Sequence, residues 1–566
     1  MAEKPQLAER FTPADFFVVR TPLLALDEVF DRQPQSASGP DRDQLRERMR
    51  ELFNRPEVRE ALLLASPSLD ETYQDWHDNP SGARGIKAEP ALVRYLVRMA
   101  GRATPFGLFA GCSVGRVSDQ QRGSAISIAP MAEYRRHTRL DMEYLCSLVA
   151  EIECRPEIRR ELRFHANSSL YRAADRWRYA EARGAGRARS YQLVAIDDCP
   201  YLRAVLDRAA TGGTPTELAA VLEPLGIETD DALTFVDELI DNQLLTSDLE
   251  PAVTGRDALT ALVARLATIP AAHDYYEILH GALLGLTNLG QQPLGEPRES
   301  YEALAQQLEP LPVKAELGRL LQTDLHKPAH GAVLGAEVTD EILRGVEVLA
   351  RQIERTDSDL LGSFRKAFSG RYGDREVPLV EVLDEELGIG FERSQSPAAA
   401  AAPLLAGITF PQRGSSTAYW TARHSVLLQK LAHVLASGTR ELRLDAADLS
   451  ATAAAEPASP PTAFAAFASI AAPSPEALAA GDFQVLLHYA AGPSGARSLG
   501  RFCQGDAELE RHVTAHLAAE AELDPDAIYA EIVHLPEGRL GNVLARPVLR
   551  QYEIPFLGRS SAPKSF

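Results

Sequence analysis

The sequence predicts an α+β protein that folds into several lobes. The chain has 566 residues, whereas a globular domain usually contains about 100–200. Segments with a helical period, such as Asp43–Phe53, alternate with short apolar segments typical of strands, such as Phe16–Leu26. The composition, 45% hydrophobic and 24% charged, is ordinary for globular proteins. We therefore expect several packed cores in one chain.

The N-terminal part contains a strand, helices and many arginines. Phe16–Leu26 predicts a strand that leads into a turn, and Pro90–Ala100 predicts a helix with proline in its first turn. Arg94, Arg98 and Arg102 are four residues apart, so they share one helical face. Three like charges on one face repel one another, and a bound anion would relieve this repulsion.

A compact module is predicted at Arg163–Leu249. Two strands, Ser169–Tyr179 and Arg189–Ile196, are joined by a glycine-containing turn and followed by helices. One helix begins after Thr214 with a capping box and a proline. A hairpin with three short helices is typical of a winged-helix module, which in isolation indicates DNA binding.

The remaining chain is less regular. The pattern from Asp257 to Arg355 is mostly helical, and Phe483–Tyr489 and Ala530–His534 predict strands. Two Ala/Pro-rich segments, near 396–403 and 451–479, predict loops.

The charge distribution leaves two interpretations open. The net charge of −20 argues against a protein coated by nucleic acid. However, eight arginines stand against two acids between Ala91 and Leu140, and ten against four between Arg155 and Arg189. Such a basic part either forms an ordinary solvated surface or binds a polyanion locally.

Several classes of enzyme are excluded by missing motifs. The sequence has no phosphate-binding P-loop, dinucleotide-binding glycine motif, zinc-protease motif or hydrolase nucleophile elbow. The histidines lack metal-ligand spacing, and the five cysteines form no CxxC pair, so we predict neither a metal site nor a disulfide framework. No secretion signal or membrane-spanning segment is evident, which favours the cytoplasm.

One arginine-rich segment, RMAGRATPFGLFAG at Arg98–Gly111, is similar to the signature of lantibiotic (class I lanthipeptide) dehydratases. Other segments resemble the same family in the same order. They are RTPLL at Arg20, ALLLASPSL at Ala61, TRLDMEYL at Thr138, SDLEPAVTG at Ser247, LQTDL at Leu321, RYGDREVPLVEVLDEELGIGF at Arg371, LGRF at Leu499 and GNVLARPVLRQYEIP at Gly541. The resemblance covers nearly the whole chain and points to the multi-lobed N-terminal glutamylation domain.

The resemblance implies a tRNA-dependent glutamyl transferase. Such an enzyme moves glutamate from glutamyl-tRNA onto Ser or Thr of a ribosomally made precursor peptide, as the first step of dehydration in lanthipeptide or thiopeptide biosynthesis. The donor ester is already activated, so no further cofactor is expected. The family's elimination half is absent, and the chain stops soon after YEIP. We therefore expect a shortened chain or a split, thiopeptide-type enzyme with a separate elimination-domain protein. Homodimers are common in this family.

Two other functions stay open. A peptide aminoacyl-tRNA ligase would form an amide instead of an ester, and a non-catalytic scaffold would only bind the leader peptide. The resemblance also reassigns the module as a leader-recognition element that binds the peptide as an added strand. The expected lobes are an arginine-rich glutamylation lobe at 1–160, the winged-helix-like module at 161–250 and the rest of the glutamylation domain at 251–566.

The resemblance assigns candidate site residues by position. For each, the alternative is a structural ion pair, a cap or a packing role. Expected catalytic residues are Arg98, Arg102, Thr104, Asp141 and Asp324; expected substrate-binding residues are Arg20 and Arg501; expected tRNA-binding residues are Arg135, Arg136 and Arg139.

Overall fold

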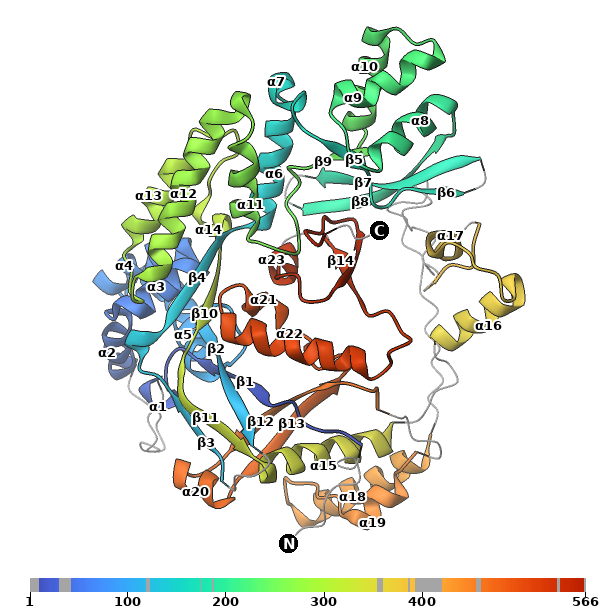
Figure 1. The fold of residues 1–566 in the computed structure, drawn as a ribbon. Coiled ribbons are helices and arrows are strands. Elements are labelled where there is room, and N and C mark those ends of the chain that lie inside the picture. The colour runs from blue at the N-terminus through green and yellow to red at the C-terminus, as the bar shows by residue number, and fades with distance from the viewer. Residues whose placement is uncertain are drawn as a thin grey trace.

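The computed structural model describes residues 10–29, 42–118, 123–173, 175–185, 188–353, 360–384, 387–391, 420–454, 460–536 and 540–563. Helices and strands are mixed along the chain, which confirms the predicted α+β class, and a six-stranded sheet lies at the centre (Figure 1). The strand order is β3-β11-β2-β10-β4, and β1 pairs with β2 outside this path. These strands are β1 (Phe16–Pro22), β2 (Gly107–Ser118), β3 (Ala125–Ile128), β4 (Arg135–Leu140), β10 (Leu321–His326) and β11 (Ala329–Gly335). No described helix is long and apolar enough to cross a membrane.

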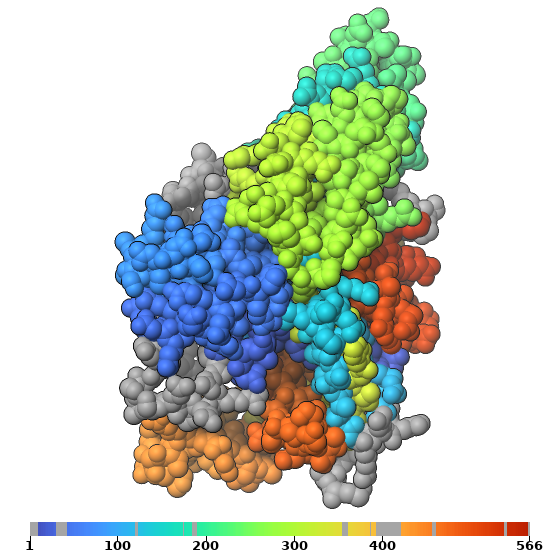
Figure 2. All heavy atoms as spheres, turned by 90° about the vertical axis from the view of Figure 1, so that its left-hand side faces the viewer, coloured from blue at the N-terminus to red at the C-terminus, as the bar shows by residue number. Residues whose placement is uncertain are grey.

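N-terminal helices cover one face of the sheet. They are α1 (Leu26–Val29), α2 (Arg42–Phe53), α3 (Pro56–Ala65), α4 (Pro67–Asp78) and α5 (Ala83–Gly101). Buried Phe53, Trp76 and Met99 pack there with Phe109 of β2 and Leu325 of β10. In Figure 2 these helices form the blue mass below the green helical lobe.

The start of α5 was predicted wrongly. Pro90 lies inside this helix, which begins at Ala83, seven residues earlier. Proline is favoured in a first turn, but here tertiary packing overrides that preference. Gly85, Ala88 and Glu89 are buried, and the Glu89 carboxylate accepts a hydrogen bond from Trp76 Nε1 at 3.1 Å.

C-terminal helices cover the opposite face of the sheet. Phe502 of α21 (Gly500–Cys503) and Val513 of α22 (Ala507–Glu522) are buried against Phe16 of β1 and Cys112 of β2. Figure 1 shows α21 and α22 in front of the sheet, although they follow β2 by nearly 400 residues. The first and last parts of the chain therefore share one core.

The largest core joins the helical lobe and the predicted leader module to the sheet. The helical lobe contains α6 (Met142–Glu153), α7 (Pro156–Arg159), α11 (Ala258–Leu266), α12 (His273–Gln291), α13 (Arg298–Leu308) and α14 (Leu317–Leu320). The module contains β5 (Phe164–Ala166), β6 (Tyr171–Ala173), β7 (Arg176–Ala185), β8 (Ala188–Asp197), α8 (Pro200–Ala209), α9 (Pro215–Ala219), α10 (Thr229–Asp241) and β9 (Leu245–Ser247). The capping box at Thr214 is confirmed, whereas the winged-helix-like interpretation stays a prediction.

The segment predicted as mostly helical, from Asp257 to Arg355, contributes two strands to the central sheet. In β10, Leu325 faces the apolar core while its neighbours Asp324 and His326 are also buried, on the other face. Buried polar residues replace the apolar run that a central strand usually shows. The sequence pattern therefore did not indicate a strand here.

The remaining elements include a correction to the loop predictions. The Ala/Pro-rich segment near 451–479 contains β12, which pairs with β13 through a stacked Phe467 and Tyr489. The other predicted loop, near 396–403, lies outside the described residues. The elements are α15 (Ala336–Gln352), α16 (Leu360–Tyr372), α17 (Leu379–Leu383), α18 (Ala422–Ser437), α19 (Ala446–Ala451), β12 (Ala465–Ala471), α20 (Pro475–Ala480), β13 (Gln484–Ala491), β14 (Ala530–His534), α23 (Gly541–Leu544) and β15 (Tyr552–Phe556).

Candidate active site

A buried carboxylate between two arginines lies where the corner of α21 and α22 meets the sheet. Asp324 of β10 is 1% exposed. Its Oδ2 accepts a hydrogen bond from Arg139 Nη2 at 3.2 Å, and its Oδ1 pairs with Arg501 of α21. A carboxylate removed from water needs such partners, so Asp324 holds both guanidinium groups in fixed positions.

Strand pairing explains why Arg139 and Asp324 meet. β4 runs antiparallel to β10, with His137 opposite Asp324 and Arg139 opposite Gln322. The side chains of Arg139 and Asp324 therefore lie diagonally across one sheet face. Burial lowers the pKa of Arg139, and the nearby Asp324 carboxylate opposes this shift.

A third arginine, Arg20, lies beside this pair on β1. It is opposite Cys112 of β2, and its Nη2 donates to the Ser498 carbonyl at 3.2 Å. Burial raises the pKa of the Cys112 thiol to about 11, and Arg20, Asp324 and Arg501 are close enough to influence it. The structure thus brings together Arg20, Asp324 and Arg501, three of the candidate site residues, and their roles stay predictions.

The side chains around Asp324 carry more positive than negative charge. Arg139 and Arg501 share one paired carboxylate, Asp324, and the carboxylate of Asp257 also lies near Arg139. Arg20 brings a third guanidinium, and no described carboxylate forms an ion pair with it. Arginine holds carboxylates and phosphates through paired hydrogen bonds. This arrangement can therefore accept one further anion.

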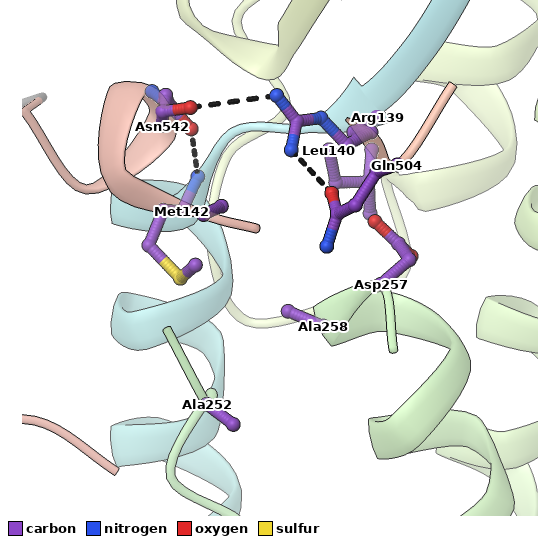
Figure 3. A pocket seen from close by; sticks show the side chains of 9 residues that line it. Arg139, Leu140, Met142, Ala252, Asp257, Ala258, Gln504 and Asn542 are labelled. Carbon is purple, nitrogen blue, oxygen red and sulfur yellow. Dashed lines mark hydrogen bonds between the residues drawn. The ribbon is translucent and has the colours of Figure 1, made fainter. Parts of the chain in front are cut away.

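On its other side, Arg139 lines a small pocket. Figure 3 shows its guanidinium between Gln504 and Asn542. Nη1 donates to Gln504 Oε1 at 2.6 Å, and Nη2 lies 3.4 Å from the Asn542 carbonyl oxygen. The pocket is lined by Arg139, Leu140, Met142, Ala252, Asp257, Ala258, Gln504, Asn542 and Ala545. Neither Gln504 nor Asn542 was predicted, although Asn542 belongs to the quoted segment GNVLARP.

Asp141 occupies a structural position, and the catalytic role expected for it stays a prediction. It is the N-cap of α6, and its Oδ1 accepts the Glu143 amide at 2.9 Å. Its Oδ2 accepts from Asn542 Nδ2 at 3.0 Å, and Asn542 Oδ1 in turn accepts the Met142 amide at 2.8 Å. Asp141 is fully buried, and it joins α6 to α23.

The three arginines expected to contact tRNA have different environments. Arg136 is buried, pairs with Glu60 and donates to the carbonyls of Leu289 and Pro293. Arg139 is buried in the cluster described above. A contact with tRNA does not fit either residue, because neither guanidinium reaches the surface. Of the three, only Arg135 is exposed.

The signature loop stands at the edge of this cluster. Gly107 follows the loop and pairs with Asp324 across β2 and β10. The Arg98 guanidinium lies 4.1 Å from the centre of the Phe106 ring. Burial, followed by the charge of Arg102, lowers the pKa of Arg98. Arg102 and Thr104 are exposed, so the loop presents one cation, Arg102, to solvent beside the half-buried Arg98.

Two buried histidines were missed from the sequence. His326 Nδ1 lies 3.8 Å from Asp506 Oδ2, and its ring centre is 6.5 Å from that of His137. Burial lowers the pKa of His137 to about 4, and Arg139 and His326 add to the shift. Both rings pack beneath Gly505, at the α21–α22 corner. Only a prediction of the β4–β10 pairing would have indicated them.

No three His, Cys, Asp or Glu side chains among the described residues are grouped so that they could hold a metal ion.

The fold and the arginine cluster match one protein family. Residues 54–565 match the family described as "Lantibiotic dehydratase, N terminus", and the chain belongs to this family. It is 25% identical over 390 residues to the subtilin biosynthesis protein SpaB of Bacillus subtilis, covering 67% of this chain and 36% of SpaB. It is 21% identical over 396 residues to the epidermin biosynthesis protein EpiB of Staphylococcus epidermidis, covering 68% of this chain and 38% of EpiB.

Solved structures of the family share the fold. The tRNA-dependent lantibiotic dehydratase MibB from Microbispora sp. 107891 superposes with a TM-score of 0.74 at 25% identity, over 97% of this chain and 51% of MibB. The glutamylation domain TbtB from thiomuracin biosynthesis gives 0.54 at 19% identity, over 87% of this chain and 58% of TbtB. The chain thus spans about half of MibB and a smaller share of SpaB and EpiB.

Proposed function

We propose that this protein transfers glutamate from glutamyl-tRNA to Ser and Thr side chains of a precursor peptide and forms an ester. The observation that carries the proposal is the cluster of Arg20, Arg139 and Arg501 at Asp324, where three guanidinium groups outnumber the carboxylates of Asp324 and Asp257. Its surplus positive charge suits the γ-carboxylate of a glutamyl group. Membership of the family supports the same reaction.

The proposed reaction needs no cofactor, because the aminoacyl ester is already activated. The peptide hydroxyl oxygen attacks the ester carbonyl, the bond to the tRNA 3′ oxygen breaks, and the hydroxyl proton ends on that leaving oxygen. Arg98 and Arg102 would bind the terminal phosphates, and Thr104 would donate a hydrogen bond to the substrate. Asp324 would act as a positioning residue, because both of its oxygens are already held by arginines.

The edge of β8 is the proposed site for the leader peptide. β8 is ten residues long and pairs on one side with β7; no other described strand pairs with it. At the opposite edge of this small sheet, α17 packs on β6, and Tyr171 of β6 and Arg178 of β7 both donate to Asp384, the residue after α17. An open strand edge offers unpaired backbone groups to an extended peptide. Leu193, 54% exposed on β8, would contact an apolar leader residue.

The proposal also includes the partners expected from the family. A separate elimination-domain protein would remove glutamate and leave the dehydrated residue. The protein would act in the cytoplasm, where charged tRNA is available, and would assemble as a homodimer. Light scattering would test the dimer, and co-purification with the elimination protein would test the pairing.

Intact-mass spectrometry tests the transfer itself. The cognate precursor is incubated with this protein, tRNA, glutamate and a glutamyl-tRNA synthetase. We expect mass increments of one glutamyl unit that disappear after mild base, as an ester requires. Increments that resist base would instead indicate an amide-forming ligase, and binding of the precursor without any increment would indicate a scaffold.

A further inference from the structure

One face of α5 forms an exposed line of positive charge. At 3.6 residues per turn, Lys87, Arg94 and Arg98 lie within about 40° of one another around the helix axis, and Arg102, the C-cap residue, directly follows the helix. Lys87, Arg94 and Arg102 are exposed, and Arg98 is half-buried. Along the helix, Lys87 to Arg98 extend over about 16 Å at 1.5 Å per residue. We call these four residues the α5 basic stripe.

The α5 basic stripe is not neutralised by neighbouring acids. Arg84 precedes it and pairs with Asp75 at 3.4 Å, but no member of the stripe forms an ion pair with a described carboxylate. The acidic residue of α5, Glu89, points inward to Arg46. The chain has a net charge of −20, so it does not need these cations to stay soluble. A row of basic side chains without acidic partners is instead suited to binding a polyanion.

The stripe ends at an exposed aromatic residue next to the active site. Phe106 is 39% exposed, and the Arg98 guanidinium stacks on its ring at 4.1 Å. The next residue, Gly107, pairs with Asp324. A planar arginine and an aromatic ring provide a stacking surface for an unpaired base. The cations therefore lead towards a base platform at the start of β2, the strand that pairs with β10, which carries Asp324.

We propose that the α5 basic stripe binds the phosphate backbone of the tRNA acceptor stem and guides its unpaired 3′ end over Phe106 to the active site. This inference rests on the proposed glutamyl transfer and locates the donor on α5 instead of β4, where Arg136 and Arg139 are buried. Contacts with the phosphate backbone set the affinity and orientation of the bound RNA, and they do not select its nucleotide sequence. An acidic peptide is the competing occupant, and the test separates the two.

The test removes two charges that are remote from the reacting groups. The double variant Lys87→Gln/Arg94→Gln is compared with Arg155→Gln/Arg160→Gln, which removes two exposed arginines at α7. Figure 1 places α7 at the upper end of the molecule, away from α5. Binding of unacylated glutamate tRNA is measured over a range of NaCl concentrations, together with precursor binding and the steady-state kinetics of transfer.

We expect the stripe variant to bind tRNA roughly tenfold more weakly and to lower the slope of log affinity against log salt by about 1.4–1.8. The KM for glutamyl-tRNA should rise while kcat and precursor binding stay unchanged, and the α7 variant should match the wild type. An unchanged slope, an equal effect in the α7 variant, or weakened precursor binding alone would overturn the inference. If the wild type transfers no glutamate, the proposed function fails, but the slopes still decide whether the stripe binds RNA.

Discussion

The substitution Gly505→Ala tests whether the α21–α22 corner must seat closely on the sheet for transfer to occur. A Cβ at this position would lie 2.4 Å from His326 Nε2 and 2.9 Å from His137 Cβ. Both histidines are held in paired strands, so the corner must move outward instead. Overpacking of this kind typically costs about 1–3 kcal/mol. Because Arg501 and Gln504 lie at the same corner, their contacts with Asp324 and Arg139 would lengthen.

The assay combines urea unfolding with the rate of ester formation. We expect the free energy of unfolding to fall by about 1–3 kcal/mol and kcat/KM to fall on the order of a hundredfold, as a displacement near 1 Å can produce. Gly331→Ala is the matched control, because nothing lies within 4 Å of its added Cβ. Combining Gly505→Ala with His326→Ala should restore part of both losses. Wild-type stability and rate in Gly505→Ala would refute this account of the corner.

Three further predictions concern buried charges. Asp324→Asn leaves two buried guanidinium groups without their carboxylate, so urea unfolding should show a loss of about 3–5 kcal/mol. Asp141→Ala removes the N-cap of α6 and should cost about 1–2 kcal/mol, while mass spectrometry shows an unchanged transfer rate per folded molecule. The pKa of His137 is about 4 in the folded protein and about 6.5 when unfolded. The unfolded state therefore binds the extra proton between these values, and stability should rise from pH 4 to 6.5 by up to roughly 3 kcal/mol; in His137→Asn this slope should flatten.

Local sequence signals predicted many of the elements well. The helix expected at Asp43–Phe53 matches α2 within one residue. The capping box predicted at Thr214 is confirmed, and its two hydrogen bonds connect residues that are three positions apart. Such features depend only on neighbours in the chain, so a single sequence is sufficient to reveal them.

The candidate site could be predicted only in part. The family resemblance located Arg20, Asp324 and Arg501, which the fold brings together. It could not assign Gln504 or Asn542 to Arg139, because these contacts span 365 and 403 residues. A glutamine or asparagine has no distinctive spacing when its partner lies on another element. The pairing of distant strands and helices decides which polar residues face the site.

The alternation of side chains along β4 separates its arginines between two environments. Alternate residues of a strand point to opposite faces, so once Arg135–Leu140 is a strand, Arg136 must face away from Arg139. The structure shows this separation, with Arg136 bound to Glu60 on one face and Arg139 bound to Asp324 on the other. Counting arginines in this segment treated them as one basic surface. The alternation instead assigns Arg136 to stability and Arg139 to the site. The longer exposed basic surface of this region is therefore that of α5.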